Sequence, residues 1–283
     1  MSVPASPANE LVARNTLDGM PSTAVNKPRR FGQPFNPPLQ DWRGKRVWLV
    51  GASSGIGLAC AQALQAAGAH VVISARELGA LSEWARQSES EGKRLELYPL
   101  AVTDSLQVKY VTRQVAAQGT IDMLLYCAGH YRAQRATDFD LPDMLRHQEV
   151  NYNGLLRVLG EALPVMLQQG FGHISLVSSV AGFRGLPKAL AYGPTKAALI
   201  NLAEILYVDL KPEHINVSLI NPGFVKTPMT AQNDFEMPAL ITPDEAAESI
   251  IKGWAKGQFH IHFPKRFTRW MLLLRILPAR MFF

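Results

Sequence analysis

The stretch Gly51-Ala52-Ser53-Ser54-Gly55-Ile56-Gly57 lies between an apolar run, 47–50, and a segment rich in helix formers, 58–67. This order predicts a short buried strand, a glycine turn and a helix, which is the context of a dinucleotide-binding site. Gly51 permits the turn, Gly55 allows backbone to approach a pyrophosphate, and Gly57 allows the helix to pack on the sheet. The spacing is G-x3-G-x-G rather than G-x-G-x-x-G. The alternative is a tight turn that holds no ligand.

Composition and charge are those of an ordinary globular protein. Of the 283 residues, 47% are hydrophobic and 18% are charged, which suffices for a sizeable core. The net charge of +6 comes from residues 1–46 and 261–283, while the middle is slightly acidic, so we expect no nucleic-acid face. Two cysteines, Cys60 and Cys127, make no disulfide framework, and no apolar run suits a signal peptide or a membrane span. We expect reduced thiols and a cytoplasmic protein.

Strand and helix patterns alternate along most of the chain. Residues 1–41 are polar and contain several prolines, which predicts a disordered or strap-like tail. Residues 42–263 show apolar runs at 46–50, 70–74, 94–98, 121–126, 172–178, 214–220 and 258–263, separated by helical stretches near 56–67, 78–91, 105–118, 140–169, 193–210 and 243–256. This predicts a single α/β domain of Rossmann type, a doubly wound parallel sheet with helices on both faces. We expect 140–169 to form two helices, with a turn near Gly160 and a kink at Pro164.

The residue after the second predicted strand bears on cofactor choice, because ligands bind at the carboxyl ends of strands in such folds. The run 70–74 ends in Ala75-Arg76, and the residue in question is Arg76. An acidic residue there would bind the ribose hydroxyls of NAD, whereas a guanidinium suits a 2′-phosphate. Arg76 therefore favours NADP(H) over NAD(H), the alternative being a solvated surface arginine.

A second group of candidates follows the fifth predicted strand. Ser179 ends this strand, and Tyr192 and Lys196 follow at i, i+4 on one face of a predicted helix. The nearby ammonium is expected to lower the pKa of the phenol and make Tyr192 a proton donor or acceptor. Ser179 can hydrogen-bond the substrate oxygen. Taken alone, a Tyr-x-x-x-Lys pair is also common on exposed helices.

Together these motifs resemble the short-chain dehydrogenase/reductase family in its single-domain form, over about residues 42–263. The resemblance assigns catalysis to Asn151, Ser179, Tyr192 and Lys196, with Asn151 positioning a water for a proton relay through the lysine. It assigns cofactor binding to the glycine turn, to segments after four of the strands and to the Tyr/Lys pair: Gly51, Ser53, Ser54, Gly55, Ile56, Gly57, Arg76, Val102, Ala128, Gly129, Tyr192, Lys196, Pro222, Gly223, Val225 and Thr227.

Two segments depart from the family pattern. The usual Asn-Asn-Ala-Gly reads Tyr126-Cys127-Ala128-Gly129, so the asparagine that braces the central strands is absent. We expect altered bracing without loss of catalysis. The usual Asp-Val reads Ala101-Val102, so a side-chain bond to adenine is missing, although the Val102 backbone can still contact it.

The resemblance implies hydride transfer between C4 of a nicotinamide and a carbonyl or secondary-alcohol carbon, in a homodimer or homotetramer. In reduction, Tyr192 gives its proton to the developing alkoxide, Ser179 stabilises that oxygen, and Lys196 grips the nicotinamide ribose. Two alternatives are a catalytically silent dinucleotide-binding regulator and an epimerase or dehydratase that uses the same Tyr/Lys pair. Apolar residues between 227 and 242, where the family has a substrate lid, favour a hydrophobic or lipid-like substrate, or else reflect core packing.

The segment 264–283 is basic and apolar. As one helix it would place Lys265, Arg266, Arg269 and Arg280 on one side. Such a helix suits an anchor on anionic lipid, a subunit interface or a cover over the active-site mouth. The first role would place the protein peripherally on the inner face of a membrane. We expect no metal, because His260 and His262 on the last predicted strand have no acidic or cysteine partner nearby in sequence.

Overall fold

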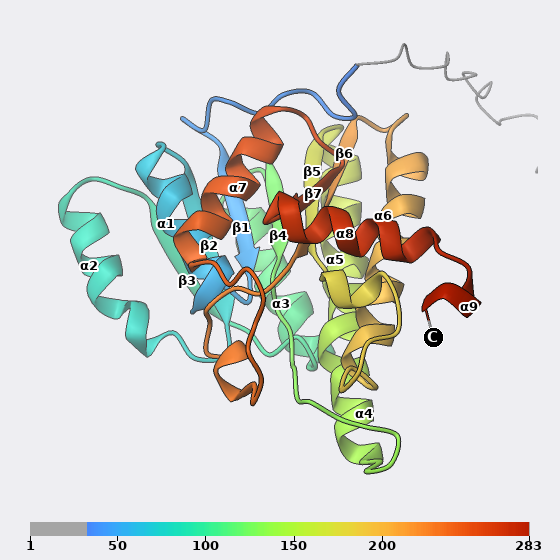
Figure 1. Cartoon of the computed structure of the whole chain (residues 1–283). Coiled ribbons are helices and arrows are strands. Elements are labelled where there is room, and N and C mark those ends of the chain that lie inside the picture. The colour runs from blue at the N-terminus through green and yellow to red at the C-terminus, as the bar shows by residue number, and fades with distance from the viewer. Residues whose placement is uncertain (1–32, 283) are drawn as a thin grey trace, which may run out of the picture. The chain divides into compact units, whose positions relative to one another are not determined.

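A seven-stranded parallel sheet forms the centre of the protein (Figure 1). The structure is a computed structural model that describes residues 33–282. The sheet order is β3-β2-β1-β4-β5-β6-β7. The strands are β1 (Arg46–Val50), β2 (His70–Ala75), β3 (Leu95–Pro99), β4 (Met123–Tyr126), β5 (Gly172–Val177), β6 (Ile215–Pro222) and β7 (His260–Phe263). Each strand begins and ends within two residues of the bounds of a predicted apolar run. The predicted Rossmann-type sheet is confirmed.

The central strand β1 shows why the sheet is covered on both faces. Trp48 and Val50 pack in one core with α3 (Ser105–Ala117), α5 (Gly154–Gln169) and α6 (Tyr192–Leu210). Val47 and Leu49 pack in a second core with α1 (Gly55–Ala66) and α7 (Pro243–Ala255). Successive side chains of a strand point to opposite faces, so an uninterrupted apolar run fills both cores. The strand order reverses between β1 and β4, and their carboxyl ends open a crevice there.

The helices on the crossovers include α2 (Ser82–Ser90) and α4 (Leu141–Gln148). α4 and α5 form the predicted pair, but the break between them is a π-helical turn, Glu149–Asn153. The predicted turn near Gly160 is wrong, because Gly160 and Pro164 both lie inside α5. The apolar face of α5 is buried in the core, and such packing outweighs the weak helix propensity of one glycine.

The N-terminal part of the described chain is a strap across the domain. The Asn36 amide donates to the carbonyl oxygen of Val217 at 2.8 Å, and the Trp42 and Trp254 rings lie 5.5 Å apart. From Pro34 onward the chain therefore belongs to one compact unit. Of the predicted tail 1–41, residues 1–32 lie outside the described residues.

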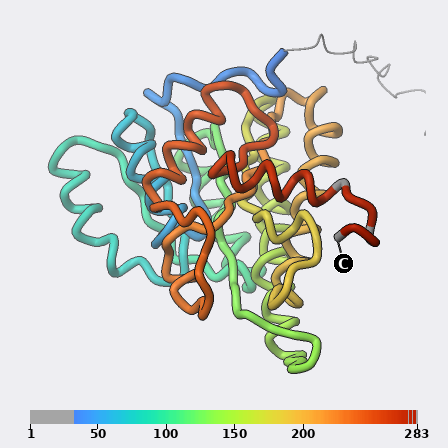
Figure 2. The backbone as a smooth tube through the Cα atoms, viewed as in Figure 1, coloured from blue at the N-terminus to red at the C-terminus, as the bar shows by residue number. Residues whose placement is uncertain are grey.

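Two helices follow β7, α8 (Lys265–Ile276) and α9 (Ala279–Phe282), and Figure 2 shows their path. Met271 and Thr268 form the buried face of α8. Because α8 ends at Ile276, Arg280 belongs to a separate helix, and the prediction that it shares one side with Lys265 is wrong. No helix within residues 33–282 has both the length and the apolar content needed to span a membrane.

Candidate active site

The glycine turn fits its neighbours so closely that side chains are excluded. Gly51 has a φ of +84°, and a Cβ there would collide with the backbone of Ala128. A Cβ on Gly57 would lie 2.8 Å from the Ala52 Cα. α1 starts at Gly55 with neither a side-chain cap nor an acidic residue in its first turn. Its N–H groups and partial positive charge are thus available, which fits a pyrophosphate.

A cavity of about 500 Å³ joins this turn to the predicted catalytic residues. Every residue predicted to bind the cofactor lines the cavity, and so does Ser179. Asn151 is the exception among the predicted site residues, because it lies buried behind the wall. The Thr227 Cγ2 would lie only 2.9 Å from a Cβ on Gly55, so these two loops approach each other across the cavity. The size and lining fit a dinucleotide.

Tyr192 and Lys196 lie one turn apart on α6, as predicted, with the Lys196 Nζ 5.4 Å from the centre of the Tyr192 ring. The Lys196 ammonium donates to the carbonyl oxygen of Val177 at 2.9 Å, and burial lowers its pKa to about 8. Burial raises the pKa of Tyr192, while the Ser179 hydroxyl acts in the opposite direction. The predicted lowering of the Tyr192 pKa is therefore wrong, because desolvation is the largest cause of its shift.

Asn151 holds the segment after β4 against α6 from behind the cavity. Its side-chain oxygen accepts a hydrogen bond from the His130 N–H at 2.6 Å. Its amide group donates to the His130 carbonyl oxygen and to the Thr195 hydroxyl, both at 3.0 Å. Asn151 therefore fixes one wall of the cavity.

The altered bracing expected at Tyr126 has a defined structure. The Tyr126 hydroxyl donates to the carbonyl oxygen of Val150 at 2.8 Å. This bond ties the end of β4 to the π-helical turn that carries Asn151. A phenol thus braces β4 at the position where the family usually has asparagine.

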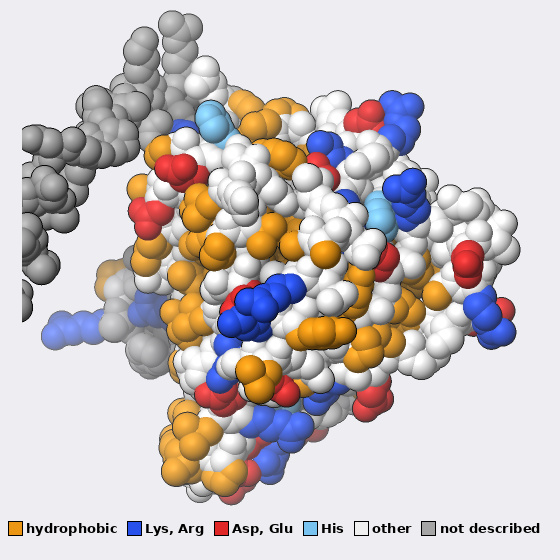
Figure 3. Space-filling view, turned by 180° about the vertical axis from the view of Figure 1, so that it is seen from behind, with side chains coloured by type: hydrophobic (Ala, Val, Ile, Leu, Met, Phe, Trp, Pro, Cys, Tyr) orange, Lys and Arg blue, Asp and Glu red, His pale blue; other side chains and the backbone are white. Residues whose placement is uncertain are grey.

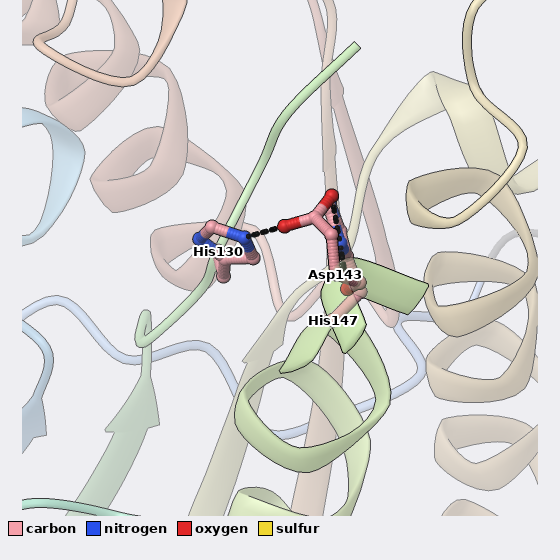
Figure 4. A group of neighbouring side chains, drawn as sticks. All are labelled: His130, Asp143 and His147. Carbon is pink, nitrogen blue, oxygen red and sulfur yellow. Dashed lines mark hydrogen bonds and ion pairs between the residues drawn. The ribbon is translucent and has the colours of Figure 1, made fainter. Parts of the chain in front are cut away.

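The sequence interpretation missed a cluster beside Tyr192: His130, Asp143 and His147 (Figure 4). Ligand atoms of the three lie within 4.8 Å of one another. His130 directly follows Ala128-Gly129, which signals a place at the cavity. Asp143 and His147 share one face of α4 at i, i+4, and this spacing is the only sequence signal for the pair.

Comparison with known proteins defines the family. The short chain dehydrogenase family profile matches residues 45–237. The chain therefore belongs to the short-chain dehydrogenase/reductase family, whose members are oxidoreductases that act on alcohols and carbonyls with a nicotinamide dinucleotide. The crystal structure of a short-chain dehydrogenase from Streptomyces avermitilis superposes with a TM-score of 0.72 at 28% identity, over 82% of this chain and 92% of that one.

Three relatives have named activities. A 2-keto-3-deoxy-L-fuconate dehydrogenase from Xanthomonas campestris is 35% identical over 67% of this chain and 61% of its own. A fatty acyl-CoA reductase from Acinetobacter baylyi is 32% identical over 74% of this chain and 72% of its own. A 3-ketodihydrosphingosine reductase from Dictyostelium discoideum is 30% identical over 78% of this chain and 75% of its own.

Proposed function

We propose that the protein is an NADP(H)-dependent oxidoreductase that interconverts a carbonyl and a secondary alcohol on a hydrophobic or lipid-like substrate. The observation that carries this proposal is the single cavity, with the glycine turn and Arg76 at one part of its wall and Ser179, Tyr192 and Lys196 at another. A cofactor bound at the turn would reach the proton-transfer group without leaving that space.

The bound nicotinamide would supply or accept the hydride at C4. The chain orients the reactants and handles the proton. Tyr192 donates its proton to the alkoxide as it forms, and the raised pKa of this phenol keeps the proton on it until then. Ser179 hydrogen-bonds the same oxygen. Lys196 holds the ribose beside Tyr192, and Asn151 keeps the adjoining wall in place.

The choice of NADP(H) rests on Arg76. It directly follows β2, is exposed and lines the cavity, where a guanidinium can bind a 2′-phosphate. We expect Arg76→Ala to raise the KM for NADPH by roughly 10- to 100-fold, the range of a lost charge-assisted bond. The KM for NADH should change little. Equal changes for both cofactors would contradict the assignment.

A hydrophobic substrate is favoured by the lid between Thr227 and Thr242. The Phe224 ring contacts Phe235, which is 40% exposed, and Leu240 nearby in the chain is 42% exposed. The named fatty acyl-CoA and ketodihydrosphingosine reductases fit this choice, whereas the named fuconate dehydrogenase does not. Assays of NADPH oxidation with ketones of increasing chain length test it. Efficiency that falls with chain length would contradict it.

The same assay separates the two alternatives. A silent regulator would bind NADPH and oxidise none of it with any carbonyl compound, and an epimerase or dehydratase would turn over without net consumption of the cofactor. Net NADPH oxidation with a ketone therefore identifies a reductase. The placement of Tyr192 and Lys196 on the cavity wall favours the enzyme over the regulator.

Two surfaces support further parts of the proposal. Lys265, Arg266 and Arg269 are exposed on α8 next to Trp270, which is 65% exposed, and this composition fits peripheral contact of a cytoplasmic protein with an anionic membrane surface.

The layer of α3, α5 and α6, on the side seen in Figure 3, exposes apolar side chains on the two long helices α5 and α6: Leu156, Leu167, Ile205 and Val208. That surface fits a homodimer or homotetramer, which light scattering measures.

A further inference from the structure

The cluster of His130, Asp143 and His147 is drawn in Figure 4 and lies beside Tyr192. The His130 Nε2 is 2.8 Å from Asp143 Oδ1. The His130 and His147 rings are 4.4 Å apart, and the His147 ring is 6.5 Å from the Tyr192 ring. The three residues differ in how many of their side-chain hydrogen-bonding atoms have a partner among the described residues.

His147 has a structural role. Its Nε2 accepts a hydrogen bond from the Arg132 N–H at 3.1 Å, and its Nδ1 lies 2.8 Å from the carbonyl oxygen of Asp143. With Nε2 accepting, Nδ1 must be the donor of a neutral ring, and burial lowers the pKa of His147, which favours that state. Both nitrogens are therefore occupied. A metal at this cluster would face a ring with no lone pair left for it, so the geometry disfavours a metal.

Asp143 orients His130. It lies in the first turn of α4, where the helix dipole stabilises an ionised carboxylate. Its Oδ2 has no hydrogen-bond partner among the described residues and lies 3.4 Å from the His147 Nδ1, whereas Oδ1 is 2.8 Å from the His130 Nε2. A carboxylate can only accept, so the proton of this bond is on the His130 Nε2. In a neutral His130 ring the lone pair is then on Nδ1.

The open nitrogen belongs to the one residue of the cluster that lines the cavity. His130 lines the cavity, whereas Asp143 and His147 do not. Nδ1 lies on the part of the ring that points away from Asp143 (Figure 4). No residue from 33 to 282 hydrogen-bonds to it. A histidine oriented by a carboxylate thus presents one unused hydrogen-bonding atom to the space beside Tyr192.

We infer that His130 is a substrate-binding residue, oriented by Asp143, that hydrogen-bonds a second oxygen of the substrate near the reacting carbon. The substrate is accordingly a ketone or alcohol that carries a further hydroxyl or carbonyl group, attached to its apolar chain. A neutral ring accepts from a hydroxyl, and a protonated ring donates to a carbonyl. This inference rests on the proposed reductase function.

Three ketones of equal chain length test it with NADPH: 2-octanone, 4-hydroxy-2-octanone and 2,4-octanedione. We expect the wild type to prefer one or both oxygenated ketones, and the preferred one shows whether Nδ1 accepts or donates. His130→Phe, which keeps a ring but removes both nitrogens, should lower kcat/KM for the preferred ketone about tenfold through KM, the effect of one lost hydrogen bond. Its loss of kcat/KM for 2-octanone should be clearly smaller, because this ketone has no second oxygen that His130 could bind.

Asp143→Asn should reproduce the KM effect of His130→Phe, because an amide no longer fixes the proton on Nε2. Leu145→Ala, an exposed position of the same helix, should behave as the wild type. Equal losses on all three ketones would show a merely structural role and overturn the inference, as would a wild type without preference.

A measurement without turnover keeps the two proposals apart. In the full chain labelled with ¹⁵N-histidine, the His130 signals should show Nε2–H in the wild type and lose that state in Asp143→Asn. Saturating 4-hydroxy-2-octanone or 2,4-octanedione with NADP⁺ should shift the Nδ1 signal. An unmoved signal overturns the role of His130 even if ketones are reduced, whereas failure to oxidise NADPH with any ketone refutes the reductase proposal alone.

Discussion

The cofactor end of the cavity and its substrate end are built in different ways. The cofactor end is centred on one contiguous stretch, 51–57, whose backbone lies against Ala128 and at the start of α1. The substrate end and its surroundings combine segments far apart in the chain: the cavity-lining His130 meets Asp143, and Phe224, next to the cavity-lining Gly223, contacts both Phe235 and Phe267. Close backbone packing can be recognised in the sequence, because it allows only glycine. Contacts between side chains that are distant in the chain produce almost no recognisable sequence pattern.

The largest effect is expected where the two ends meet, at Tyr192. Tyr192→Phe removes the proton donor and keeps the ring that packs 5.0 Å from Tyr131. We expect kcat to fall by roughly 10²- to 10⁴-fold, the usual contribution of a positioned acid or base. NADPH binding, measured by fluorescence titration, should be almost unchanged. Near-normal turnover in this variant would show that Tyr192 is not the proton donor.

A second prediction concerns the cofactor end alone. Gly51→Ala places a Cβ on the Ala128 backbone and keeps a positive φ. We expect a loss of roughly 4 kcal/mol in the free energy of unfolding, from overpacking and left-handed strain together. Gly44→Ala is the matched control, because Gly44 has a similar φ of +73° and open space around its Cβ position. The control should lose only about 1 kcal/mol, as measured by urea unfolding.

If the two glycine variants lose equal stability, the close approach to Ala128 contributes nothing. The glycine at position 51 would then be a requirement of the turn only.

The contrast between the two ends of the cavity explains which parts of the molecule could be predicted from the sequence. The seven strands and the lining of the cofactor site follow from apolar runs that fill two cores and from glycines that permit close approach. The π-helical turn at 149–153 could not be predicted, because the Tyr126–Val150 hydrogen bond that holds it joins residues 24 apart. The pKa of Tyr192 was predicted in the wrong direction for a related reason. Spacing on a helix reveals a nearby charge but does not reveal burial.

Lys196 lies where the cofactor end and the substrate end of the cavity meet. The burial of its charge affects the stability of the protein as well as its pKa. Its pKa is about 8 in the folded protein against the ordinary lysine value of 10.5, and burial is the main cause. Below pH 8 both states carry the ammonium, so the folded state bears the full cost of burying it. Between about pH 8 and 10.5 the unfolded state binds more protons, and stability rises with pH. At higher pH the lysine is neutral in both states.

Lys196→Met, studied without cofactor, should therefore be more stable than the wild type by about 3 kcal/mol near pH 7. The difference should shrink toward zero as pH approaches 10.5. Comparing the two proteins cancels the titration of groups that do not interact with Lys196. Cys127 is not such a group, because burial raises the pKa of its thiol to about 12 while Lys196 lowers it. Urea unfolding at several pH values measures the difference. A difference that is constant with pH would show that the lysine is not buried as a charge.

The smallest expected effect lies at the outer rim of the substrate end. Arg269→Ala on α8 should weaken binding to vesicles of mixed neutral and anionic lipid about fivefold, since one basic residue near such a surface contributes about 1 kcal/mol. Arg113→Ala removes the same charge from an exposed position on a different helix, α3. It should leave binding unchanged if α8 faces the membrane. Co-sedimentation measures both variants, and a common loss would assign the attraction to overall charge. Loss in Arg269→Ala alone would place α8, whose Phe267 packs against the cavity-lining Gly223, at the lipid surface.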